Sequence, residues 1–155
     1  MHNWRTGRSC LYKNYAHLVF TTKYRQMVFT KEMLEYLQGV FMETCEQMGC
    51  ELLEFSGEDS HVHLLVSIHP KVAVANLVSK LKGKSSYLIR KEFKDHVKTM
   101  LWGKQFWSPS YCVVSCDGTS LDVVNRYISE QNAPPSEKSL RAAKAANKSK
   151  TNELA

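Results

Sequence analysis

The stretch ELLEFSGEDSHVHLLVSI, residues 51–68, holds two short segments rich in apolar residues with a polar turn between them. The pattern predicts a strand over Glu51–Ser56, a tight turn over Gly57–Ser60 and a second strand over His61–Ile68. Strands joined by so short a turn pair in antiparallel fashion. The sequence therefore predicts a β-hairpin in the middle of the chain, with the other elements arranged around it.

The segments on either side of this hairpin alternate between strand and helix. Before it, Tyr12–Lys23 is predicted as a strand, and Thr30 as the start of a helix that ends at Gly49. After it, Pro70 precedes a second helix whose apolar residues share one stripe: Val74, Leu77, Val78, Leu81 and Leu88. A loop rich in lysine and tryptophan then leads to a fourth strand, Tyr111–Cys116. The order β-α-β-β-α-β predicts an α+β class with an antiparallel sheet, the split-βαβ, ferredoxin-like or RRM-like fold.

The composition is that of a folded domain with a basic surface. A chain of 155 residues with 43% apolar content can bury a core of its own. No apolar run approaches the ~20 residues that span a bilayer, and the N-terminus is not a signal peptide, so we expect no membrane association. The net charge of +6 favours a polyanionic partner such as nucleic acid. Five cysteines without a CxxC pair favour reduced thiols and a cytoplasmic location.

The composition shifts after Ala133-Pro134-Pro135. Residues 136–155 carry five lysines and arginines against two glutamates, which accounts for +3 of the net charge. Few large apolar residues occur there, so a packed core is not expected. The sequence predicts one domain over residues 1–132 and a basic, flexible tail over residues 133–155.

The two histidines of the HVH stretch have the spacing of a metal site. His61 and His63 are two residues apart, so on a strand both side chains project from one face, with Cβ atoms ~7 Å apart. Imidazoles at this separation can converge on one metal ion. Two half-exposed strand histidines without a role are an equally simple interpretation, because HxH alone is a weak motif. A metal site would also need a third ligand from elsewhere.

The segment TSLDVVNRYISEQN offers candidates for that ligand. Thr119 and Asp122 form a capping-box start for a last helix, Ser120–Gln131. Tyr127 and Gln131 are one turn apart, on a flank beside the apolar stripe of this helix. Taken alone, the pair also fits a packed aromatic residue beside a solvated amide.

Together, HVH after a short turn and Tyr-x-x-x-Gln on a terminal helix resemble the single-tyrosine HUH transposases (TnpA-like) of small bacterial insertion sequences. LKGKSS, residues 81–86, and FWSPSYCV, residues 106–113, occur in the order expected for these enzymes. The resemblance covers roughly residues 12–132. It implies a fold with an extra C-terminal helix that carries the tyrosine.

The resemblance also implies an activity and roles for four residues. His61, His63 and Gln131 are expected to bind Mg²⁺ or Mn²⁺, and Tyr127 is expected to be the nucleophile. The implied enzyme is a metal-dependent strand transferase that cleaves and rejoins single-stranded DNA at hairpin-bearing element ends through a 5′-phosphotyrosine. It acts as a homodimer with composite active sites, in the cytoplasm at the nucleoid of a bacterium or archaeon. Imidazole ligands by themselves suit Mn²⁺ or Zn²⁺ better than Mg²⁺.

Basic residues near aromatic ones are candidates for DNA contacts. On the second predicted helix three lysines and one tyrosine fall on one stripe beside the apolar stripe: Lys80, Lys84, Tyr87 and Lys91. Such a stripe can follow a phosphate backbone and stack a base, although a charged helix face is more often only solvated. Lys13, Lys23 and Arg25 flank the first predicted strand and are further candidates. For Trp107 the core is the first expectation.

Three other functions remain open at this point. A domesticated nuclease that processes palindromes would have the same site residues. A non-catalytic RRM-like binding module would share the fold, but HLVFTTKYR is not an RNP-type signature and a binding sheet does not need HxH. A metal-dependent phosphodiesterase that uses water would leave Tyr127 as a packing residue.

Overall fold

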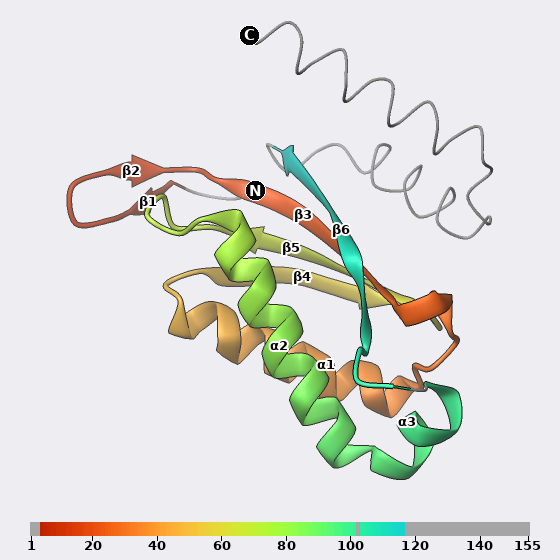
Figure 1. The fold of residues 1–155 in the computed structure, drawn as a ribbon. Coiled ribbons are helices and arrows are strands. Elements are labelled where there is room, and N and C mark those ends of the chain that lie inside the picture. Colours follow the sequence, from red (N-terminus) through yellow and green to blue (C-terminus); the bar gives the residue numbers. More distant parts are fainter. Residues whose placement is uncertain (1–3, 102, 117–155) are drawn as a thin grey trace, which may run out of the picture. The chain divides into compact units, whose positions relative to one another are not determined.

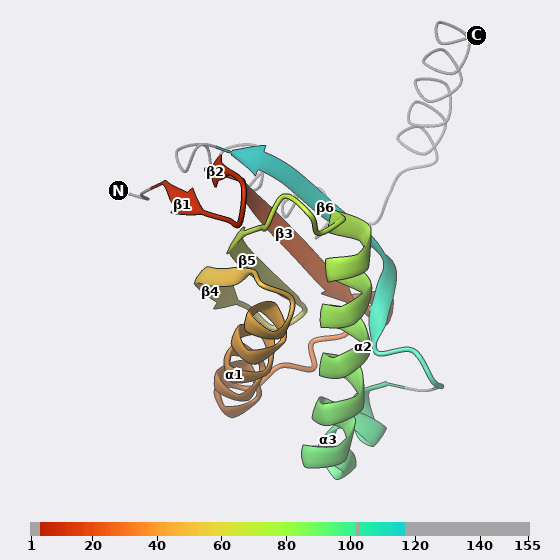
Figure 2. The same cartoon turned by 90° about the vertical axis from the view of Figure 1, so that its left-hand side faces the viewer.

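The computed structural model describes residues 4–101 and 103–116. Within them, a four-stranded antiparallel sheet in the order β4-β5-β3-β6 carries two long helices, α1 and α2, on one face (Figure 1, Figure 2). In chain order the elements are β3 (Tyr15–Thr22), α1 (Lys31–Gln47), β4 (Glu51–Gly57), β5 (His61–Ser67), α2 (Val74–Glu92) and β6 (Trp107–Cys116). Because β5 lies between β3 and β4, the βαβ unit is split. This confirms the predicted ferredoxin-like fold.

The core lies between the sheet and the two helices. Alternate residues of β5, Val62, Leu64 and Val66, are fully buried there, and Leu18 and Phe20 of β3 join them. The helices contribute Met33, Leu37, Phe41, Leu77, Leu81 and Ile89, all buried. Burying a large apolar side chain contributes about 1.5–3 kcal/mol. The period of two along the strands therefore decides which residues of β5 point away from this core, and these include His61 and His63.

Local signals place the helix and the hairpin that flank the site as predicted. The side chain of Thr30 caps α1 by accepting a hydrogen bond from the Met33 N–H, and Gly49 follows the helix with φ +74. The β4–β5 turn closes with a bond from the Glu58 N–H to the His61 carbonyl, 2.9 Å. A side chain at Gly57 would clash with Leu34 of α1 at 2.5 Å, so glycine allows the turn to approach that helix.

Several predicted boundaries were wrong. β6 begins at Trp107 rather than Tyr111, because Trp107 is buried and its Nε1–H donates to Ser85 Oγ at 2.9 Å. The core expectation for Trp107 is confirmed. The loop before it contains a further helix, α3 (Lys94–Met100). On α2 the buried line continues through Ser85 and Ile89, while Leu88 is only partly buried.

The first strand also differs from its prediction. β3 starts at Tyr15, after a small separate hairpin of β1 (Arg5–Thr6) and β2 (Leu11–Tyr12). It ends at Thr22, and the 3-10 turn η1 (Lys23–Arg25) follows. The predicted helix Ser120–Gln131 and tail 133–155 lie outside the described residues, so the predicted domain boundary at 132 stays a prediction. No helix within the described residues is long and apolar enough to cross a membrane.

Candidate functional site

The side chains of His61 and His63 lie on the face of the sheet opposite α1 and α2. The pairing register places His63 directly between Ser56 of β4 and Val19 of β3, and His61 opposite Thr21. His61 is 6% exposed and His63 is partly buried. The two imidazoles therefore share one face of β5, as predicted, and His61 is buried on that face.

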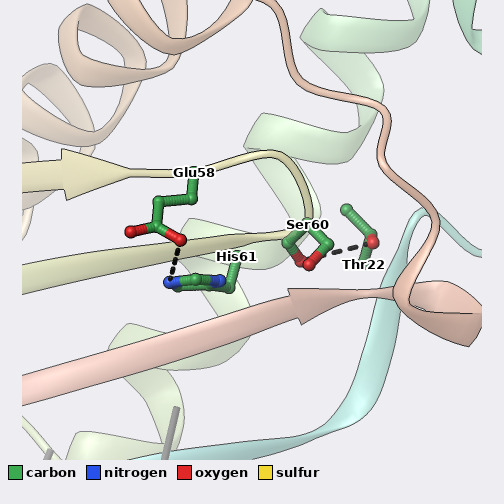
Figure 3. Close-up of polar contacts among 4 residues, drawn as sticks. All are labelled: Thr22, Glu58, Ser60 and His61. Atoms are coloured by element: carbon green, nitrogen blue, oxygen red, sulfur yellow. Dashed lines mark hydrogen bonds and ion pairs between the residues drawn. The ribbon is translucent and has the colours of Figure 1, made fainter. Parts of the chain in front are cut away.

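The turn that leads into β5 fixes the position of His61. Thr22, at the end of β3, binds the Ser60 carbonyl through its backbone N–H at 2.9 Å and its hydroxyl at 3.3 Å (Figure 3). The Thr22 hydroxyl also donates to the Gln26 carbonyl at 2.7 Å. The carboxylate of Glu58 approaches His61 Nε2 at 4.0 Å (Figure 3). Thr22 thus ties the histidine strand to the segment that follows β3.

A third histidine belongs to this face. Nδ1 of His17, in the middle of β3, lies 2.6 Å from Nε2 of His63, and the two ring centroids are 4.8 Å apart. His17 is 2% exposed. The sequence alone does not reveal this contact, because 46 positions separate the two residues. The available signal was its position in an apolar strand that the fold pairs with the HVH strand.

Burial favours the neutral form of all three imidazoles by lowering their pKa values. Burial lowers the pKa of His61, and the nearby carboxylates of Glu58 and Asp59 oppose this shift. Burial also lowers the pKa of His63, with a smaller contribution in the same direction from His17. The pKa of His17 is lowered by burial too, against the opposing carboxylate of Glu54. Because a histidine binds a metal in its neutral form, these environments suit metal ligands.

The predicted DNA contacts fall into three separate places. Lys23 and Arg25 belong to η1, at the end of β3 where Thr21 pairs with His61. Between them Tyr24 is 76% exposed with φ 58, and the Lys23 ammonium lies 5.2 Å from its ring centroid. Lys13 lies before the opposite end of β3, over the ring of Trp4. The η1 residues are therefore at the His61 end of the histidine strand, and Lys13 is near its other end, where Tyr15 pairs with Ser67.

The basic stripe of α2 lies on the helix side of the sheet. Lys80 and Lys91 are exposed, and Tyr87 is 67% exposed. Lys84 is partly buried and donates to Gln47 Oε1 of α1. The stripe is thus beside the buried line of α2, as predicted, but the sheet separates it from His61 and His63.

Two predicted site residues, Tyr127 and Gln131, lie outside the described residues. Within residues 4–101 and 103–116, no group of three or more histidine, cysteine and acidic side chains is placed to hold a metal ion. Two imidazoles of the donor set, those of His61 and His63, lie on one face of β5 and are close in the chain. A complete site would need a further ligand of another type or from another part of the protein.

Fold and site together define a ferredoxin-like domain with an HVH pair on the face of its sheet that points away from α1 and α2. The family model for IS200-like transposases matches residues 10–131. The chain belongs to this family. Membership in a transposase family makes it an enzyme that cleaves DNA and transfers strands.

Individual relatives agree with this assignment. The chain is 32% identical over 130 residues to the ISDra2 transposase TnpA of Deinococcus radiodurans, covering 83% of this chain and 91% of the relative. It is 31% identical over 115 residues to the transposase for insertion sequence element IS200 of Salmonella typhimurium, covering 74% of each.

Solved structures give the same fold. A crystal structure from Deinococcus radiodurans R1, provisionally assigned as a transposase, superposes with a TM-score of 0.73 at 31% identity and covers 84% of this chain and 99% of that one. A REP-associated tyrosine transposase bound to a REP hairpin gives a TM-score of 0.53 at 11% identity, covering 85% of this chain and 74% of that one. At 11% identity the second likeness shows the fold alone.

Proposed function

We propose that this transposase cleaves and rejoins single-stranded DNA at hairpin-bearing element ends, with Tyr127 as nucleophile and Mg²⁺ or Mn²⁺ bound by His61, His63 and Gln131. The observation that carries the proposal is the pair of imidazoles on one face of β5, in a chain of the IS200-like family. Burial lowers the pKa of both rings, which favours the neutral form that binds a metal. Gln131 would add an amide oxygen without adding charge.

The reaction would proceed by transfer to the protein. The Tyr127 hydroxyl loses its proton as its oxygen attacks the scissile phosphorus, and the bond from phosphorus to the 3′-oxygen breaks. The products are a 5′-phosphotyrosine and a free 3′-hydroxyl. A phenol has an ordinary pKa of about 10, so it is a weak nucleophile at neutral pH. When bound, a divalent ion supplies positive charge that neutralises the phosphate and the departing oxygen.

Rejoining reverses these steps. A 3′-hydroxyl from another strand attacks the phosphorus, a new phosphodiester forms and the phenol leaves with a proton. One phosphodiester is exchanged for another through the tyrosyl ester, so no nucleotide cofactor is consumed. This balance fits strand transfer better than hydrolysis by water.

DNA would be held by the basic and aromatic residues near both faces of the sheet. Lys23, Arg25 and the exposed ring of Tyr24 offer phosphate and stacking contacts beside the histidine strand. The α2 stripe (Lys80, Lys84, Tyr87 and Lys91) and Lys13 are more distant contacts suited to a hairpin stem. A tyrosine transposase of the same fold is bound to a hairpin, so the fold is able to present a surface of this kind.

A homodimer is proposed because β6 is the longer of the two edge strands of the sheet. It is ten residues long, and its outer side has no partner strand among the described residues. A long unpaired edge favours pairing with another strand. In such a dimer, the histidine pair of one subunit would act together with Tyr127 of the other in a composite site.

Covalent trapping tests the mechanism. Wild-type protein mixed with single-stranded hairpin DNA and Mn²⁺ should form an adduct on a denaturing gel. Tyr127→Phe should abolish the adduct and leave hairpin binding intact, while the matched Tyr36→Phe change on α1 should keep it. Cleavage by Tyr127→Phe would contradict the tyrosyl mechanism. His61→Ala should lose the adduct and the metal dependence, and His69→Ala, just beyond β5, should not.

Mixing two inactive variants tests the composite site. In a mixed dimer of Tyr127→Phe and His61→Ala subunits, a composite arrangement creates one site with both wild-type residues. Adduct formation should therefore return after subunits are exchanged. If each site were built within one subunit, both sites of the mixed dimer would stay inactive and no adduct would appear.

A further inference from the structure

His17 is a buried histidine that the proposed reaction does not use. It is 2% exposed in the middle of β3, on the face that carries His63. Its direct neighbours across the sheet are apolar, Leu65 on β5 and Val114 on β6. A leucine or valine would fill this position without burying polar nitrogens. The choice of histidine therefore needs a reason other than packing.

The reason is found in its contact with His63. Nδ1 of His17 and Nε2 of His63 are 2.6 Å apart, and the rings are inclined at 32°. At this distance the two nitrogens form a hydrogen bond: one of them carries the hydrogen and donates it, and the other accepts the bond through its lone pair. The contact therefore couples the tautomers of the two rings and limits how the His63 ring is turned on the sheet. When His63 donates its Nε2–H to Nδ1 of His17, its own Nδ1 is left unprotonated and free for a metal ion.

The other ring nitrogen of His17 indicates that stable packing of the core does not explain the contact with His63. Nε2 of His17 is buried and has no hydrogen-bond partner among the described residues. A buried polar atom without a partner lowers stability. Residues that break a packing rule at a cost to stability are expected at functional sites.

We propose that His17 is a positioning residue for metal binding, which holds the ring and the tautomer of His63 before the ion arrives. This inference rests on the proposed metal site. Histidine ligands generally have a hydrogen-bond partner on the ring, which fixes their orientation and raises their affinity for the metal. For His63 that partner is His17.

Calorimetric titration of the full-length protein with Mn²⁺ tests the role, using three substitutions of His17. His17→Leu removes both nitrogens and suits the apolar row, so the fold should persist, as checked by thermal unfolding. It should lower the Mn²⁺ affinity by about 10–100-fold. His17→Asn keeps a polar atom near the place of Nδ1 and should retain most of the affinity. His17→Gln moves the amide toward the place of Nε2 and should behave like His17→Leu.

A second measurement needs no metal. Two-bond ¹H–¹⁵N spectra of the metal-free protein report the tautomer of each histidine, and His63 should show one tautomer in wild type and a mixture in His17→Leu. An unchanged Mn²⁺ affinity and an unchanged His63 tautomer in His17→Leu would overturn the role of His17 alone. A folded wild-type protein that does not bind Mn²⁺ would overturn the proposed metal site and this inference with it.

Discussion

The buried contact between Ser85 and Trp107 makes a sharp test of how β6 is anchored. Ser85 is fully buried on α2, and its Oγ accepts the Trp107 Nε1–H at 2.9 Å. The indole lies among aromatic rings, with centroids of Phe106 at 4.9 Å and Phe20 at 5.8 Å. Water therefore has no ready access to Nε1 if the serine is removed.

Ser85→Ala should destabilise the protein by the cost of leaving this donor unpaired. An unsatisfied buried donor costs about 1–3 kcal/mol. For a domain of this size, a loss of about 2 kcal/mol lowers Tm by about 4–8 °C. Thermal and urea unfolding of the metal-free protein measure the change. Trp107→Phe removes the donor itself, so Ser85→Ala should cost less in that background, with a coupling of about 0.5–3 kcal/mol between the two positions.

Ser86→Ala is the matched control. Its hydroxyl donates to a helix carbonyl three residues back, Gly83 O at 3.1 Å, just as that of Ser85 donates to Lys82 O at 3.2 Å, but it has no indole partner. The control should change stability by no more than about 0.5 kcal/mol. Equal effects of Ser85→Ala and Ser86→Ala would refute the reasoning, because the bond to Trp107 would then contribute nothing.

Two further predictions concern the histidine face. Because burial lowers the pKa of His17, His61 and His63 in the folded protein, the unfolded chain binds more protons just below the ordinary histidine value of 6.5. Their contribution to stability is thus complete above pH 6.5 and is lost as the pH falls through the lowered pKa values. Urea unfolding should therefore give a lower free energy of unfolding at pH 5 than at pH 7.5. The same free energy of unfolding at both pH values would contradict the lowered pKa values. Thr22→Val keeps the shape of the side chain but removes a buried hydroxyl bonded to the Gln26 and Ser60 carbonyls. The substitution should lower the free energy of unfolding by about 1 kcal/mol and speed amide hydrogen exchange at Tyr24. Unaltered exchange at Tyr24 would show that the hydroxyl does not hold η1 in place.

The parts of the fold that could be predicted are those in which burial requires apolar residues to recur at a fixed spacing along the chain. Val62, Leu64 and Val66 must face the helices, so His61 and His63 had to share the other face of β5. Thr30 and Gly49 carry their own signals for the ends of α1. These features depend on residues that are near in the sequence, and the sequence is sufficient for them.

Features that depend on pairing between distant segments could not be predicted. The contact of His17 with His63 joins residues 46 positions apart and depends on the register of β3 against β5. Tyr24 and Arg25 adopt positive φ without the glycine or asparagine that would signal a left-handed turn. The early start of β6 follows from the Trp107 bond to α2, which an alternation pattern does not contain.

The burial of the histidine face also bears on how the proposed site would work. A metal ion binds an imidazole nitrogen that carries no proton. At an exposed histidine with an ordinary pKa, the ion and protons therefore compete for the ring at slightly acidic pH. The lowered pKa values of His61 and His63 move this competition to lower pH, at the expense of stability in acid. Glu58 and Asp59 oppose the shift at His61 while adding negative charge beside it, which favours a cation. The same burial that weakens the fold in acid therefore favours the neutral, metal-binding form of both proposed ligands.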